Sequence, residues 1–236
     1  MANITITNND LNSPILEGAE FRNETIEFGG ADTLAPGTIM ARQTVDTAVA
    51  NGAADGGNTG DGTVTVVSVV AGPVVPLAGA YILECTAAVT NGGVFKLEDP
   101  NGSLVASDLI LTVGAGAATV LEAGGLQFTV TDGATDFAVG DFFTLTVVAN
   151  GDLVPYAIAG AGGAQIPIAI LTYEVVATGV QDIPSRVGVS GKYRKEKLII
   201  DADGDGSSIT NAILDQLRSY GLVPVDVQEL NIQDNQ

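Results

Sequence analysis

The chain has 236 residues, enough for one large domain or two smaller ones that each bury a core. Its 28 acidic and 9 basic residues give a net charge of −19, which disfavours nucleic acid and anionic membranes as partners, because phosphate binding needs clustered Lys and Arg. The absence of His and the single Cys exclude Ser-His-Asp and Cys-His catalysis, His-containing metal sites and an internal disulfide.

Residues 1–34 are predicted to form an N-terminal arm that does not fold alone. The stretch "ITIT" alternates like a strand, but the polar and glycine-containing stretches after it offer little apolar area to bury. Composition leaves two interpretations open: a disordered tail, or a strand that orders by pairing with another protein's sheet edge. The sequence shows no signal peptide and no apolar run long enough to span a membrane, so we expect a soluble protein made in a cytoplasm.

Residues 56–149 are predicted to form a self-contained antiparallel β-sandwich of Ig-like type. Short apolar or alternating runs follow one another there, and each is closed by a turn signal. The stretch "EDPNGS" (98–103) predicts a hairpin turn, because Pro fixes φ and Asn-Gly tolerates left-handed geometry. Cys85 lies in an apolar run, where we expect a small buried hydrophobic residue rather than a nucleophile.

Residues 35–55 and 150–236 are predicted to fold together around a C-terminal helix. The apolar residues of that helix have the spacing of one helical stripe, and Gly221 is expected to end it. The strands before residue 56 have no sheet of their own, so the simplest arrangement makes the sandwich an insertion. The predicted fold class is therefore mainly β: a small β-rich domain with a C-terminal helix, interrupted by the sandwich.

The stretch "DADGDGSS" resembles the start of a calcium loop. Four of its residues match the first half of an EF-hand: Asp201, Asp203, Asp205 and Gly206. The position of the bidentate Glu is taken by Ala212, and the preceding residues are predicted to be a strand rather than a helix. We therefore favour a connection in which Ser207 or Ser208 caps the helix, and we predict no metal site, with a weak calcium site left as the alternative.

Five of the nine basic residues lie close together in the sequence: Arg186, Lys192, Arg194, Lys195 and Lys197. They are either an electrostatic docking patch or the solvated face of an edge strand that lysine protects from aggregation. The glycine-rich stretch 159–165 lacks the lysine of a phosphate-binding loop and is predicted to be a tight connection between strands. No carboxylate pair, activated nucleophile or ligand cluster is apparent, so we expect neither enzyme activity nor a cofactor.

Four stretches together resemble a known family: "APGTIMARQTV" (35–45), "GDLVPYAIAGAGGAQIPIAILTYEVVATG" (151–179), "VGVSGKYRKEKLII" (187–200) and "ITNAILDQLRSYGL" (209–222). They resemble the head decoration proteins of tailed bacteriophages, the family of phage lambda's protein D. The predicted sandwich departs from the lambda protein and looks like a module inserted in larger phage decoration proteins.

The resemblance implies a trimeric cement protein on the exterior of the virion, bound to the major capsid protein at three-fold and local three-fold sites of the expanded head. There it would brace the shell against packaged DNA, with the sandwich projecting outward. The resemblance also makes the arm a capsid-binding strand. The residues that it assigns to shell binding are Ala2, Asn3, Ile4, Thr5, Ile6, Thr7, Leu11 and Ile15. The alternative, from a different class, is an adhesive or glycan-binding surface module that works through its sandwich.

Overall fold

The computed structural model describes residues 13–47, 49–72, 74–114 and 116–227. These residues divide into two compact units, which we call the barrel unit and the sandwich unit. The barrel unit contains the described residues up to Arg42, residues 152–157 and those from Ile166 onward, and the sandwich unit contains residues 43–151 and 158–165.

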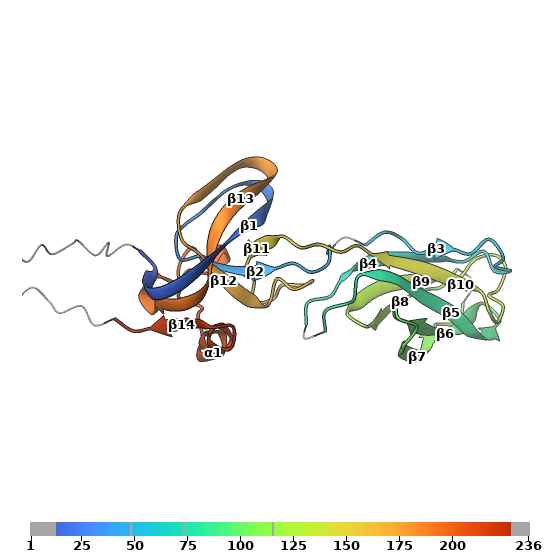
Figure 1. The fold of residues 1–236 in the computed structure, drawn as a ribbon. Coiled ribbons are helices and arrows are strands. Elements are labelled where there is room, and N and C mark those ends of the chain that lie inside the picture. The colour runs from blue at the N-terminus through green and yellow to red at the C-terminus, as the bar shows by residue number, and fades with distance from the viewer. Residues whose placement is uncertain (1–12, 48, 73, 115, 228–236) are drawn as a thin grey trace, which may run out of the picture. The chain divides into compact units, whose positions relative to one another are not determined.

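A single six-stranded sheet builds the barrel unit, in the order β1-β11-β2-β12-β13-β14. Its strands are β1 (Ile15–Leu34), β2 (Ile39–Arg42), β11 (Leu153–Pro155), β12 (Pro167–Leu171), β13 (Val175–Arg194) and β14 (Leu222–Val225). Because β1 also pairs with β13, the first five strands close on themselves as a small barrel. Figure 1 shows β1 and β13 side by side as one long curved ribbon.

Two apolar clusters lie on opposite faces of this closed sheet. The inner cluster takes residues from all five barrel strands, including Ile26, Met40 and Leu171. The outer one lies between the sheet and α1 (Asn211–Ser219), which buries Ile213, Leu214 and Leu217 as the helical stripe predicted. Neighbouring residues of a strand point to opposite faces, so short strands such as β2 serve both clusters.

The C-terminal end of α1 agrees with the prediction from the sequence, whereas its N-terminal end does not. Tyr220 follows the helix and Gly221 adopts a φ of 82°, so the predicted glycine stop is confirmed. The predicted cap at Ser207 or Ser208 is wrong, because the Thr210 hydroxyl accepts the hydrogen bond from the Ile213 N–H. The residues before it are held in short turns, so the helix begins later.

The predicted N-terminal arm does not extend to residue 34. From Ile15 onward the chain is β1, a strand of 20 residues that pairs with β13 as far as Leu34. Ile26 and Phe28 are buried, whereas most other residues of the strand stay partly or fully exposed, so a poorly apolar sequence still forms a barrel strand. The part of the predicted arm before Ser13 lies outside the described residues.

The sandwich unit consists of two antiparallel sheets of five and three strands. The larger sheet has the order β3-β10-β5-β6-β7, with β3 (Ala53–Ala54), β10 (Phe142–Val147), β5 (Gly79–Val89), β6 (Gly92–Glu98) and β7 (Leu104–Leu111). The smaller one has the order β4-β9-β8, with β4 (Thr63–Val69), β9 (Leu126–Thr131) and β8 (Ala118–Ala123). One apolar core contains residues of both sheets, among them Leu83 and Phe128.

The predicted fold class, mainly β with a C-terminal helix, is confirmed, but the limits of the sandwich differ from the prediction. The unit begins at Gln43 rather than at residue 56, because β3 pairs with β10. Residues 158–165 join it as well, since the Gly162 carbonyl accepts a hydrogen bond from the Thr44 N–H.

Two local predictions inside the sandwich unit are confirmed. The turn between β6 and β7 is closed by the Asp99 N–H, which donates to the Ser103 carbonyl, and by the Gly102 N–H, which donates to the Asp99 carbonyl. Cys85 is fully buried in the apolar core, and this burial raises the pKa of its thiol. The predicted burial of Cys85 among apolar side chains is therefore confirmed.

Candidate functional site: a groove on the barrel unit

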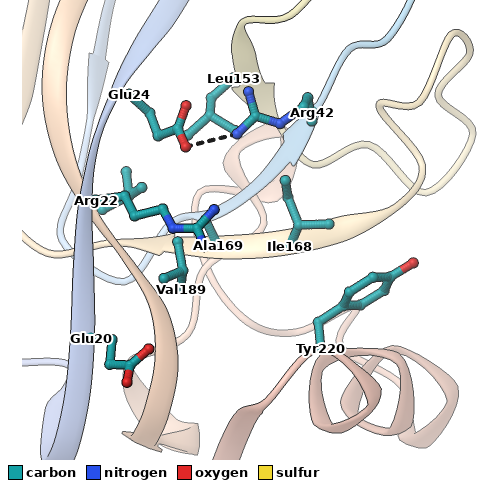
Figure 2. Close-up of a pocket in the computed structure, with 10 residues that line it drawn as sticks. Glu20, Arg22, Glu24, Arg42, Leu153, Ile168, Ala169, Val189 and Tyr220 are labelled. Atoms are coloured by element: carbon teal, nitrogen blue, oxygen red, sulfur yellow. Dashed lines mark ion pairs between the residues drawn. The ribbon is translucent and has the colours of Figure 1, made fainter.

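A groove lies where the inward-facing row of β1 changes from apolar to charged (Figure 2). Every second side chain of a strand shares a face, so Glu20, Arg22 and Glu24 continue the row of the buried Ile26 and Phe28. Charged side chains in a row that otherwise fills a core are typical of a site rather than of packing. The groove has a volume of about 330 Å³, within the size range of ligand pockets.

Arg42 of β2 lines the groove because only the short strand β11 lies between β2 and β1 in the sheet. Leu153 of β11 is in register with Ile26 of β1 on one side and with Arg42 of β2 on the other. Arg42 Nη2 lies 2.9 Å from Glu24 Oε1, the pair drawn with a dashed line in Figure 2. This pair is partly exposed and contributes under about 1 kcal/mol to stability, but it neutralises the charge of Glu24 inside the groove.

Arg22 differs from the other arginines of the described residues. The structure gives each of the others a carboxylate or an aromatic ring: Arg42 with Glu24, Arg186 with Phe21, Arg194 with Glu196 and Arg218 with Asp215. Arg22 has no such partner within the described part of the chain, although Glu20 and Glu24 flank it on the same strand face. Figure 2 shows its guanidinium group over Val189 and Ala169.

Apolar side chains form the rest of the groove. Leu153, Val187 and Ala169 are buried beneath it, and Ile168 is half-buried beside them. Tyr220, the residue that follows α1, lies at the rim with 47% of its surface exposed. Figure 2 places Ile168 between Tyr220 and the arginines.

The lining combines charged and apolar side chains. Its polar groups are two glutamates, two arginines and a tyrosine, and its other side chains are aliphatic. Within the described residues, no three His, Cys, Asp or Glu side chains are placed to hold a metal ion together. A guanidinium beside apolar side chains and an aromatic ring suits a ligand that carries both an acceptor and an apolar part.

The residues predicted to bind the capsid are mostly not described. Ala2, Asn3, Ile4, Thr5, Ile6, Thr7 and Leu11 lie outside the described residues. Ile15 is the first residue of β1, where it is in register with Tyr193 and packs against the outer apolar cluster. Ile15 therefore contributes to the barrel unit, and the shell-binding role of the other residues stays a prediction.

The first part of the predicted basic patch lies on β13. Lys192 Nζ is 2.7 Å from Glu17 Oε2 of β1, and the guanidinium of Arg186 lies 4.3 Å from the centre of the Phe21 ring. The edge-strand interpretation is wrong, because Lys192 is in register with Glu17 on one side and with Val223 of β14 on the other.

The rest of the patch follows in η1 (Lys195–Lys197). Arg194, just before η1, is 6% exposed, and its Nη1 lies 3.5 Å from Glu196 Oε1. Lys195 Nζ lies 3.2 Å from Asp226 Oδ1. Three of the five cations therefore have a carboxylate partner within the chain, which weakens the field of the patch, and docking through it stays a prediction.

The three aspartates of the calcium-like stretch have separate local roles. Asp201 and Asp203 are the first and last residues of the short helix η2 (Asp201–Asp203). Burial together with the charge of Asp32 raises the pKa of Asp201. The Asp205 carboxylate accepts a hydrogen bond from the Ser207 N–H, and hydrogen bonding to Ser207 lowers the pKa of Asp205. The stretch is thus a sequence of turns that leads to the Thr210 cap.

The groove was not predicted, although part of it is visible in the sequence. The stretch "EFRNE" alternates charged with other residues, which is the pattern of one strand face. Arg42 and Tyr220 join this face only through long-range pairing of strands, which no local pattern reveals.

Comparisons with known proteins do not define a family. No family model matches the sequence, and no curated protein matches it. Among solved structures, the crystal structure of FlgL from Xanthomonas campestris is similar with a TM-score of 0.31 and 21% identity over 49% of this chain and 33% of that one. The match thus spans a third of the FlgL chain, and such a TM-score does not define a shared fold. No helix among the described residues has the length and apolarity needed to cross a membrane.

Proposed function

We propose that the protein is a structural decoration protein of a tailed-phage capsid, which binds expanded heads as a homotrimer and stabilises them against internal DNA pressure. The proposal rests on where the four stretches that resemble decoration proteins lie in the fold. They are far apart in the sequence, yet they supply β2, β11, β12, most of β13 and α1, which belong to one compact unit. The sandwich, which departs from the lambda protein, is the other unit.

Our proposal assigns shell binding to the residues before Ser13, because Ile15 begins a strand of the barrel unit. A segment that adds a strand to a neighbouring sheet gains backbone hydrogen bonds. In a trimer, three such segments raise one another's effective concentration at the shell.

A truncation tests the proposal. The full chain is expected to have three times its mass of 23.9 kDa in light scattering and to sediment with expanded heads that lack it. A variant without residues 2–11 should keep this mass and its melting temperature but lose sedimentation with heads, because the barrel begins only at Ile15. A monomeric mass, together with absence of the protein from purified virions, would contradict the proposal.

The sandwich unit favours a second candidate, adhesion to a glycan or host surface. Four apolar side chains on or next to the edge strands β7 and β8 are more than half exposed: Leu104, Ile110, Val113 and Val120. Exposed apolar patches mark interaction sites. A glycan array probed with the full chain and with Ile110→Ser tests this candidate, which requires binding by the full chain and weaker binding by the variant.

A further inference from the structure

We propose that the groove of the barrel unit is a docking site for an acidic side chain that follows or precedes an apolar residue in an extended peptide of a protein partner. This inference is independent of the decoration function. It rests on Arg22, on the two carboxylates that flank it and on the apolar surface beside it.

The guanidinium group of Arg22 gives the groove a preference for an anionic ligand. Its planar donors match a carboxylate with two parallel hydrogen bonds. In a chain with 28 acidic residues, every other described arginine contacts a carboxylate or a ring of its own chain. Among the described residues, Arg22 is the one arginine that lies in the groove and has no such partner there.

The flanking carboxylates limit the charge of the ligand. Arg42 neutralises Glu24 at 2.9 Å, which leaves Arg22 and Glu20 with opposite charges in the groove. A second negative charge on the ligand would meet Glu20 without a cation to balance it. A singly charged carboxylate therefore fits better than a phosphate.

The remaining surface selects an apolar neighbour of the acid. Ile168 and Val189 are half-buried and border the groove, as does the half-exposed Tyr220. An aliphatic side chain that covers them would remove their apolar surface from water. Because the groove is partly open to solvent rather than enclosed, a stretch of extended chain can reach it, with the acid and the apolar residue as neighbours.

An NMR titration tests the proposal. Labelled protein receives the blocked peptide acetyl-Leu-Glu-Leu-amide while the Nε–Hε signal of Arg22 is followed, and a saturable shift is expected. The matched peptide acetyl-Leu-Gln-Leu-amide should cause no saturable shift. Arg22→Gln should weaken peptide binding about tenfold or more, because a hydrogen bond between two charged groups is lost.

The control variant is Arg186→Gln, which removes an arginine of the same unit that lies over Phe21 outside the groove. It should bind the peptide as the unchanged chain does, and both variants should keep the melting temperature. Equal binding of the Glu and Gln peptides, or unchanged binding by Arg22→Gln, would overturn the proposal. So would equal affinity for inorganic phosphate or for free 4-methylpentanoate, since the site would then recognise any anion or a small acid rather than a peptide.

Discussion

At the scale of single residues, Asp141 fixes two loops of the sandwich unit. Its carboxylate accepts hydrogen bonds from the N–H groups of Thr59 and Gly60 at 2.8 Å and from that of Ala138 at 2.9 Å. Burial alone would raise the pKa of this carboxyl, but the three N–H donors outweigh it and hold the pKa below its ordinary value of 3.8. The charged form is therefore the one that the fold stabilises.

Asp141→Asn is expected to lower the free energy of unfolding at neutral pH by roughly 1.5–3 kcal/mol, because hydrogen bonds to a charged acceptor are weakened. Since the folded-state pKa is depressed, the stabilisation is fully present above pH 3.8 and is lost as the pH falls through the lower folded value. Denaturant titrations at neutral and acidic pH measure both effects. The gap between the two proteins should narrow in acid, and a constant gap would refute the assigned role of the charge.

Asp132 is the opposite case, a buried carboxylate without support. It is 4% exposed, and neither of its oxygens has a hydrogen-bond partner among the described residues. Burial of an unpaired charge costs more than burial of an amide of the same shape. We expect Asp132→Asn to raise the free energy of unfolding by about 1 kcal/mol or more. Denaturant titration measures the change, and a loss of stability would show that the carboxylate has a partner in solution.

At the scale of elements, Gly188 of β13 leaves the space that a buried tyrosine of the same strand occupies. A Cβ added to Gly188 would lie 2.1 Å from the Tyr193 hydroxyl oxygen, whereas one added to Gly179 of the same strand would meet nothing within 4 Å. Tyr193 is fully buried and its hydroxyl donates to the Ser190 carbonyl. Its side chain therefore has little freedom to move away.

Gly188→Ala is expected to destabilise the barrel unit by about 1–3 kcal/mol, the usual cost of overpacking a core. Gly179→Ala is the matched control, and it should leave stability unchanged or raise it slightly, because alanine has less freedom in the unfolded chain. Thermal melting of the two variants separates these outcomes. Equal melting temperatures would mean that Tyr193 is not held as rigidly as its contacts indicate.

At the scale of the whole molecule, the sequence predicts features that depend on near neighbours. The turn at 98–103 and the apolar stripe of α1 were predicted, since their residues lie within a few positions of one another. The strand β1 was missed because its outward residues are polar and its partner β13 lies far along the chain. The groove was missed for the same reason, since Arg42 and Tyr220 reach Arg22 only in the closed barrel.

The two units have separate apolar cores, and each core defines a potential unit of unfolding. The sandwich core contains residues between Val45 and Ala161, and the barrel unit has its own two clusters. Because domains with their own cores can unfold separately, we expect calorimetry of the full chain to resolve two transitions. Asp141→Asn should lower only one of them and Gly188→Ala only the other. A single transition that both variants shift equally would show instead that the chain unfolds as one cooperative unit.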